Sequence, residues 1–290
     1  MKQKSNNKMV DIELEPNPSM PINKKKTKHR LLIGTPTMGI VRVEWVSARF
    51  GQIIPCNWSH SDMQQMLNPF MPIGYQIADA ENMTAKAVIE GGYEWFLSIE
   101  DDNVIPQKTF LKLNEYMIRG DIPIISGLYF TKSVPPEPIM YRESGAGYYA
   151  DWKLGEKVWV SGIPFGCTLI HRSILQVLWD ESPEYMVNGI KTRRVFNTPA
   201  DAKIDAETGA LISEMGTSDL AWCKRMKDDN IFEKAGWPEY QKMENPLLVD
   251  TSIFVHHIDR IDGTVYPRAL PQDFVEGRIT FKQAIAKLTA

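Results

Sequence analysis

The stretch Tyr93-Glu94-Trp95-Phe96-Leu97-Ser98-Ile99-Glu100-Asp101-Asp102 passes from apolar to acidic residues in a single step. Its first part is rich in aromatic and aliphatic side chains, which favours a buried β-strand. The three acids repel one another, so placing them directly behind a buried strand costs free energy unless a cation binds there. The stretch therefore predicts a strand whose carboxyl end carries a cluster of carboxylates.

The segments around this strand alternate between strand and helix patterns. Such alternation predicts an α/β fold with a mostly parallel, Rossmann-like sheet flanked by helices. Ligands bind beyond the carboxyl ends of the strands in such sheets, where Gly34-Thr35-Pro36 and Glu100-Asp101-Asp102 are both expected. Helices are expected at residues 41–50, 78–91 and 110–119. A further strand is expected at residues 122–128, and residues 31–37 read as a buried strand that ends in a loop of Gly, Thr and Pro.

The composition of the 290 residues is that of an ordinary globular protein. Hydrophobic residues make up 43% and charged residues 24%, and the net charge of -3 gives no general attraction to nucleic acid or anionic membranes. Three widely spaced cysteines, Cys56, Cys167 and Cys223, argue against a disulfide framework or a zinc site. With no bilayer-spanning apolar run and no signal-like start, we expect a cytoplasmic protein.

The acidic cluster Glu100-Asp101-Asp102 is a candidate metal site. Mg²⁺ and Mn²⁺ take oxygen ligands and commonly bridge one or two carboxylates to the phosphates of a substrate. Residues i and i+2 of an extended chain point to the same side, so Glu100 and Asp102 could face one site together. A solvated acidic turn that caps the next helix is the alternative, because acids also favour helix N-termini.

The order of these motifs resembles the GT-A glycosyltransferases, in particular the family-2-like group of bacteria and phages. The resemblance rests on Ile33-Gly34-Thr35-Pro36, on Ala80-Glu81-Asn82, and on the acidic strand end with its nearby Pro106. It implies that Thr35, Pro36, Asn82, Glu100 and Asp101 contact a nucleotide sugar. Glu81 departs from the group's usual Arg, and Lys132 is the candidate replacement for that positive contact, unless it is an ordinary surface lysine.

Three later segments extend the resemblance. The small-residue segment 160–170 implies that Gly166 lines the site, although glycine also serves tight packing. Segment 216–225 resembles an x-E-D element, with Ser218 in the usual place of Glu; it implies that Asp219 is the general base, whereas a helix cap is the alternative. In segment 247–258 the resemblance makes His257, rather than His256, a metal ligand together with Asp102.

The resemblance implies a metal-dependent glycosyltransferase. Mn²⁺ or Mg²⁺ would assist transfer from a nucleoside-diphosphate sugar, a UDP- or GDP-sugar foremost, to an acceptor hydroxyl with inversion. The acceptor stays open between a glycan, a lipid-linked molecule, a protein and modified DNA. A nucleotidyltransferase and a non-catalytic GT-A-like binding protein are the alternative functions.

The resemblance spans about Leu31 to Ile258 and sets the expected domains. These are a flexible basic tail over residues 1–29, a GT-A domain over residues 30–262, and a C-terminal helical extension over residues 263–290. Residues 272–290 read as one amphipathic helix. The polar stretch 195–214 reads as an irregular loop beside the site.

Overall fold

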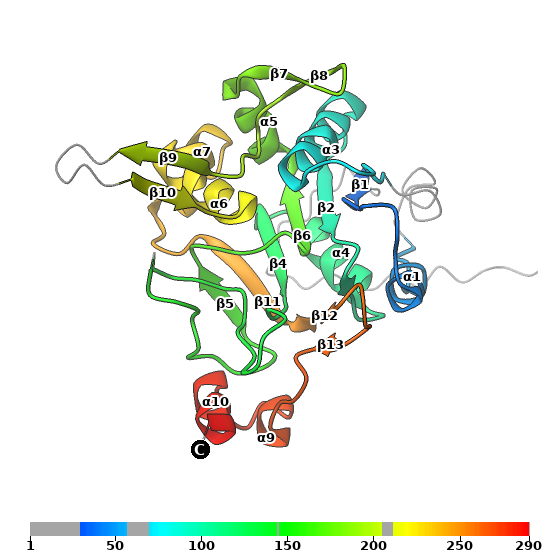
Figure 1. The fold of residues 1–290 in the computed structure, drawn as a ribbon, viewed down its shortest axis with the longest axis vertical. Coiled ribbons are helices and arrows are strands. Elements are labelled where there is room, and N and C mark those ends of the chain that lie inside the picture. The colour runs from blue at the N-terminus through cyan, green and yellow to red at the C-terminus, as the bar shows by residue number, and fades with distance from the viewer. Residues whose placement is uncertain (1–29, 57–69, 144, 205–210, 290) are drawn as a thin grey trace, which may run out of the picture.

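The computed structural model describes residues 30–56, 70–143, 145–204 and 211–289, so the expected basic tail lies outside the described residues. Its centre is a six-stranded sheet with the strand order β1-β2-β6-β4-β11-β5 (Figure 1). The strands are β1 (Leu31–Gly34), β2 (Trp95–Ile99), β6 (Cys167–His171), β4 (Ile124–Leu128), β11 (Leu247–Phe254) and β5 (Lys157–Val160).

Four strands of this sheet run in one direction. β1 pairs in parallel with β2, and β4 pairs in parallel with β11. β6 is antiparallel to both β2 and β4, and β5 is antiparallel to β11. The expected α/β fold with a largely parallel sheet is confirmed, and the two antiparallel strands are the departure from it. Every residue of β1, β2 and β4 is buried, as strands covered on both faces require.

Helices flank the sheet, and the three predicted from the sequence are confirmed within a few residues. α3 ends where glycine allows it, because Gly92 adopts a left-handed conformation (φ 64°) that receives the helix C-terminus. Among the helices, α3 packs on α5, α5 packs on α7, and α7 packs on α6 and α8. The helices are α1 (Val43–Phe50), α3 (Ile77–Gly91), α4 (Thr109–Arg119), α5 (Arg172–Glu181), α6 (Ser218–Asp228), α7 (Ile231–Lys234) and α8 (Pro238–Lys242).

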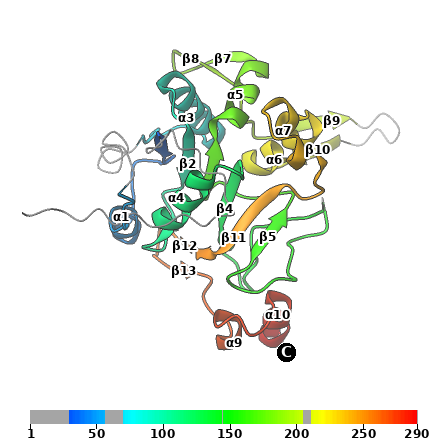
Figure 2. The same ribbon diagram turned by 180° about the vertical axis from the view of Figure 1, so that it is seen from behind.

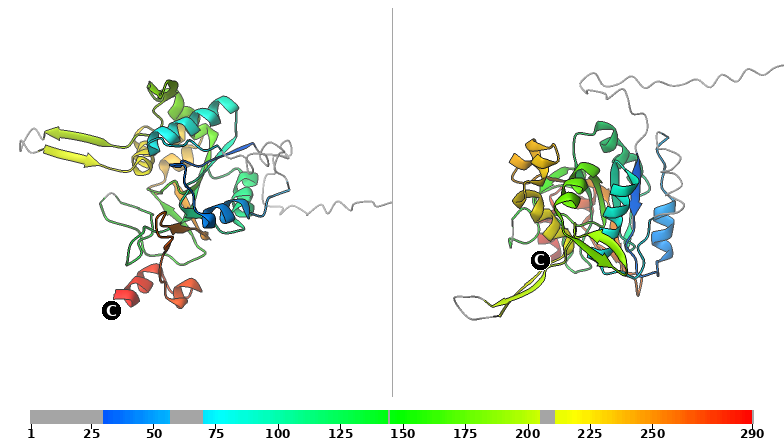
Figure 3. Two further views of the ribbon diagram at one scale, coloured as in Figure 1. Left: turned by 45° about the vertical axis from the view of Figure 1, so that its right-hand side comes forward. Right: turned by 90° about the horizontal axis from the view of Figure 1, so that it is seen from above.

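Small antiparallel ribbons surround the sheet. One is β7 (Glu184–Val187) with β8 (Ile190–Arg193), and another is a three-stranded sheet of β3 (Asn103–Val104), β12 (His256–Ile258) and β13 (Val265–Tyr266). A third corrects the expected irregular loop over residues 195–214: β9 (Ala200–Ile204) and β10 (Leu211–Met215) pair in register. This hairpin projects from the body of the molecule (Figure 3).

The C-terminal segment forms two helices, α9 (Gln272–Val275) and α10 (Phe281–Thr289), which corrects the single helix expected over residues 272–290. The chain turns between them at Gly277, whose φ of 69° favours glycine. Both helices lie at one end of the molecule, away from α1 (Figure 2). Among the described residues, no helix is long and apolar enough to cross a membrane.

An aromatic cluster attaches these helices to the core. Phe281 is fully buried and stacks on Trp152 with ring centroids 5.3 Å apart, and it also meets Phe274 and Phe130.

Replacing Phe281 with alanine is expected to lower the free energy of unfolding by about 3–5 kcal/mol, the usual cost of a buried Phe→Ala change. Chemical denaturation checks this. The partly exposed Leu288 on the same helix is the control, and equal losses for both alanine variants would contradict the packing.

Candidate active site

The turn that follows β2 holds the three acids in a fixed position. The Glu100 backbone N–H donates to the Gly166 carbonyl at 3.1 Å, and its carbonyl accepts from the Trp45 indole N–H at 2.8 Å. Asp101 and Asp102 are only 1% and 6% exposed. The acids are therefore part of the interior edge of the sheet and do not form a solvated turn.

The Asp102 carboxylate lies close to the nitrogen atoms of three side chains. Its Oδ2 lies 2.9 Å from Lys132 Nζ, 3.2 Å from His257 Nε2 and 3.5 Å from Arg260 Nη2. Burial raises the pKa of Asp102, but the hydrogen bonds and charges of these three side chains outweigh it and hold the pKa below its usual range. Asp102 is thus a carboxylate at any physiological pH.

His257 is oriented by the strand that carries it. β12 pairs with β3, which sets His257 opposite Asn103, and the ring nitrogen Nδ1 lies 3.0 Å from the Phe130 carbonyl. The ring is held with Nε2 facing Asp102, so Nε2 either donates the hydrogen bond that lowers the pKa of that carboxyl or, in its unprotonated form, shares a cation with it. The ring of His256 instead lies against Phe254.

Arg260 is a site residue that the sequence reasoning missed. Its guanidinium forms an ion pair with Asp101 and lies near Asp102. The signal was a cation three positions after His257, which the turn behind β12 brings back over the acids. Together with Lys132, Arg260 gives this edge of the sheet two cations and two carboxylates in mutual contact.

Glu100 differs from its neighbours in protonation. Burial, and after it the negative charges of Asp102 and Asp219, raises the pKa of Glu100 to about 8. Its Oε2 accepts a hydrogen bond from the Asn103 amide at 3.3 Å. At neutral pH the carboxyl group is mostly neutral, so it can donate a hydrogen bond to a ligand.

Asp219 lies in the first turn of α6 and belongs to the same site. Its charge is close enough to raise the pKa of Glu100, Glu81 and Tyr129. Its Oδ1 accepts hydrogen bonds from the Thr217 hydroxyl and from the Leu220 N–H, so the carboxylate does cap the helix. Burial raises the pKa of Asp219, which moves its carboxylate toward better proton acceptance.

The two positions that depart from the GT-A pattern contact each other. The Ser218 hydroxyl donates to Glu81 Oε2 at 2.9 Å, across 137 positions of sequence. Burial raises the pKa of Glu81 well above its usual range. An acid on α3 is therefore satisfied by a hydroxyl on α6.

Asn82 and Thr35, two other residues expected to contact a nucleotide, differ in whether their side-chain polar atoms are already hydrogen-bonded. The Asn82 amide is used inside the protein, since it donates to the Tyr185 hydroxyl and the Phe196 carbonyl and accepts from the Phe196 N–H. It ties α3 to segment 185–196 and has little left for a ligand. Thr35 and Pro36 follow β1, beside β2, and the buried Thr35 hydroxyl has no hydrogen-bond partner in the described residues.

Gly166 forms the floor beneath Glu100. A Cβ at this position would overlap the Asn103 amide and lie 2.5 Å from the Tyr129 hydroxyl, while the Gly166 N–H donates to that hydroxyl at 2.8 Å. Asn103 and Tyr129 are 0% and 3% exposed, so neither side chain can simply swing away. The close approach explains why this position carries glycine.

Replacing Gly166 with alanine is therefore expected to push Asn103 and Tyr129 apart and to cost about 1–3 kcal/mol of stability, as overpacking does. Thermal or denaturant unfolding measures this. At Gly216 a Cβ would only touch Pro199 at 3.4 Å, so Gly216→Ala is the matched control with little expected effect. A neutral Gly166→Ala variant would contradict the packing.

The donor atoms here fit a divalent cation. Three buried oxygens on consecutive residues, Asp101 Oδ2, Asp102 Oδ1 and Asn103 Oδ1, have no hydrogen-bond partner in the described part of the chain. Within that same part, no group of three or more His, Cys, Asp or Glu residues is arranged to hold a metal. Asp102 and His257 offer two protein ligands, which suits Mg²⁺ or Mn²⁺ because such ions usually complete their coordination with water and substrate phosphates.

Comparisons with known proteins show only distant likeness. No protein-family model matches the sequence, and no curated protein matches it. The structure of A197 from STIV is similar at 16% identity and a TM-score of 0.44, over 80% of this chain and 87% of that chain. A glycosyltransferase involved in the glycosylation of the major capsid of PBCV-1 is similar at 9% identity and a TM-score of 0.27, over 52% and 66% of the two chains. A CMP:2-keto-3-deoxy-manno-octonic acid synthetase complexed with CTP reaches 8% identity and a TM-score of 0.26, over 76% and 88%.

Proposed function

We propose that this chain is a metal-dependent glycosyltransferase that uses a nucleoside-diphosphate sugar, with UDP- and GDP-sugars as the first candidates. The observation that carries the proposal is the contact of Asp102 with His257, Lys132 and Arg260 at the end of β2. One carboxylate, one imidazole and two cations in contact form a site for a diphosphate and its counter-ion. Asp219 supplies a separate carboxylate at the same edge.

The cations Lys132 and Arg260 take the role of diphosphate contacts. As the bond between the sugar and the diphosphate breaks, negative charge grows on the departing phosphate oxygens, and fixed cations stabilise that charge. Both side chains pair with Asp101 or Asp102 without ligand, so the acids hold them in place. A divalent ion at Asp102 and His257 would add Lewis-acid stabilisation of the same leaving group.

Asp219 takes the role of general base. The acceptor hydroxyl loses its proton to the Asp219 carboxylate, its oxygen bonds to the anomeric carbon, and the nucleoside diphosphate leaves with the electrons of the broken bond. Attack from the face opposite the leaving group inverts the anomeric configuration. The neutral Glu100 carboxyl would donate a hydrogen bond to the bound donor.

A calorimetric panel tests the donor site. UDP, GDP, CDP and dTDP are titrated into the protein with and without Mn²⁺ or Mg²⁺, and we expect one diphosphate to bind tightly only with metal. Arg260→Ala is expected to weaken that binding, with the surface variant Arg119→Ala unchanged. Failure of every diphosphate to bind would refute the donor site, and release of pyrophosphate from a nucleoside triphosphate with a sugar phosphate would indicate a nucleotidyltransferase.

A further inference from the structure

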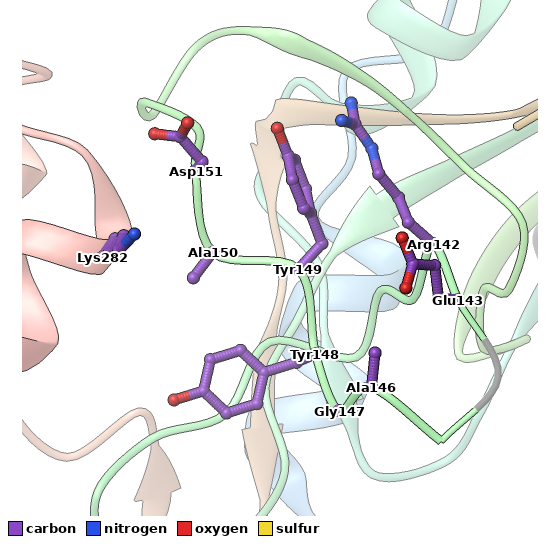
Figure 4. Close-up of a pocket in the computed structure, with 9 residues that line it drawn as sticks. All are labelled: Arg142, Glu143, Ala146, Gly147, Tyr148, Tyr149, Ala150, Asp151 and Lys282. Carbon is purple, nitrogen blue, oxygen red and sulfur yellow. The ribbon is translucent and has the colours of Figure 1, made fainter.

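A second concave site lies apart from the acidic cluster. It is a pocket of about 440 Å³ between segment 142–151 and the start of α10, within the range of 300–1,000 Å³ that small-molecule sites commonly have (Figure 4). None of the side chains assigned to the donor site or to the base lines it. Its main side chains are Arg142, Glu143, Tyr148, Tyr149, Asp151 and Lys282.

The wall formed by Arg142 and Tyr149 is held in shape. The Arg142 guanidinium lies over the Tyr149 ring at 3.7 Å from its centroid, and Arg142 Nε donates to the Trp159 carbonyl at 3.0 Å. The Tyr149 N–H donates to the Met140 carbonyl at 2.8 Å. These contacts hold Arg142 and Tyr149 in place before any ligand arrives, which reduces the ordering cost of binding.

The opposite wall is anchored to the core through α10. The Lys282 N–H donates to the Ala150 carbonyl at 2.9 Å, and the neighbouring Phe281 is fully buried. The Tyr148 ring meets Phe281 edge to face, with centroids 6.0 Å apart. In Figure 4, Asp151 and Lys282 stand on one side of the pocket and Arg142 and Glu143 on the other, with the Tyr149 ring between them.

The polar groups around the pocket are available to a ligand. Within the described residues, no hydrogen bond or ion pair engages the side-chain tips of Tyr148, Glu143, Asp151 or Lys282. Two acids and two bases cancel in charge, which disfavours a nucleotide, a phosphate or a metal ion as the occupant. Carboxylates accept, ammonium and guanidinium groups donate, and tyrosine hydroxyls do both.

We propose that this pocket binds a saccharide and is the docking site for a glycan acceptor, an assignment of acceptor class that rests on the proposed function. A sugar ring has an apolar face of C–H bonds, which matches the negative face of a tyrosine ring, and a rim of hydroxyls that both donate and accept. The pocket offers the Tyr148 ring, the Tyr149 ring, one face of which Arg142 already covers, and a mixed set of donors and acceptors without net charge.

The position of the segment connects the pocket with the base. Tyr141, directly before the pocket residues, pairs with Gly162, and a Cβ on Gly162 would meet the Leu220 side chain at 3.1 Å, next to Asp219. Burial and then the charge of Asp219 raise the pKa of Tyr141. The chain therefore passes from the neighbourhood of the base into the saccharide pocket within a few residues.

The test measures saccharide binding directly. An array of neutral mono- and oligosaccharides is probed with the full chain, and the best binder is titrated by calorimetry. We expect the affinity for the best-binding saccharide to fall at least tenfold in Tyr148→Ala and to fall clearly in Asp151→Asn and Lys282→Gln. Asp151 and Lys282 are exposed, so these two variants are expected to fold normally. Tyr75→Ala and Asp228→Asn, a ring and an acid outside the pocket, are the matched controls and should bind as the unaltered chain does.

The outcomes separate this assignment from the donor site. Saccharide binding retained in Asp102→Asn, which disables the donor site, supports an independent pocket. If a diphosphate binds but no saccharide on the array does, the saccharide pocket is refuted and the donor site stands. The same conclusion follows if saccharide binding is unchanged in Asp151→Asn and Lys282→Gln. If a saccharide binds but no nucleoside diphosphate does, the saccharide pocket is supported and the glycosyltransferase proposal is refuted.

Discussion

Replacing Asp102 with asparagine is expected to reduce sugar transfer by about a thousandfold, the upper range for removing one transition-state electrostatic contact. The variant keeps the shape of the side chain but removes the charge that Lys132, His257 and Arg260 share. The two cations then lose their common partner, and a divalent ion held as proposed would lose its carboxylate ligand. Release of nucleoside diphosphate in the presence of Mn²⁺ measures the rate.

The control for this change is another buried aspartate. Asp250 is 5% exposed and accepts a hydrogen bond from the Tyr116 hydroxyl at 2.7 Å, on the far part of β11. Asp250→Asn is expected to lower stability without reducing turnover per folded molecule. Turnover in Asp102→Asn equal to that of the unaltered chain would remove Asp102 from the donor site.

The elements that follow from local pattern are those that could be predicted from the sequence. β2 is buried throughout and ends just before its first acid, and α3 ends at its glycine pair, because burial and backbone freedom act within a few residues. The hairpin β9–β10 could not be predicted this way. Its strands are defined by the pairing of Ala200–Ile204 with Leu211–Met215, which no local pattern in the polar stretch 195–214 indicates.

The same contrast between local pattern and long-range contacts holds for the site. The acids, Lys132 and His257 could be identified from motif order, but the contact of Arg260 with Asp101 spans 159 positions and no local pattern encodes it. Asn82 matches the motif, yet its amide is used by Tyr185 and Phe196 more than 100 positions away. A short motif gives the residue type, whereas long-range packing decides which groups the side chain contacts.

The charges explain why the acidic cluster is tolerated. Asp101 and Asp102 are each paired with a cation, whereas burial raises the pKa of Glu81 and raises that of Glu100 to about 8, so Glu100 is mostly neutral at pH 7. The site thus holds its acids in two protonation states, as sites that need both an anion and a hydrogen-bond donor do. The charge of Asp219 contributes to both raised pKa values.

Replacing Asp219 with asparagine is expected to lower kcat by about 10²–10⁴-fold, the usual contribution of a general base, while the affinity for the nucleoside diphosphate stays unchanged. Asparagine keeps an oxygen that can cap α6, so the helix start survives. The ability to take the acceptor proton is lost, and the charge that raises the pKa of Glu100 is lost with it. Single-turnover kinetics with a saturating donor separates this loss from binding.

The pH profile and the product stereochemistry make the test of Asp219 specific. Because the pKa of Asp219 is raised, kcat/KM should fall as the pH drops through a higher range than for an ordinary aspartate, since the protonated acid accepts no proton. That acid limb should disappear in Asp219→Asn and persist in Asp228→Asn, the exposed acid on the same helix. An unchanged acid limb, or a product with retained anomeric configuration, would exclude Asp219 as the base and leave its carboxylate as the cap of α6.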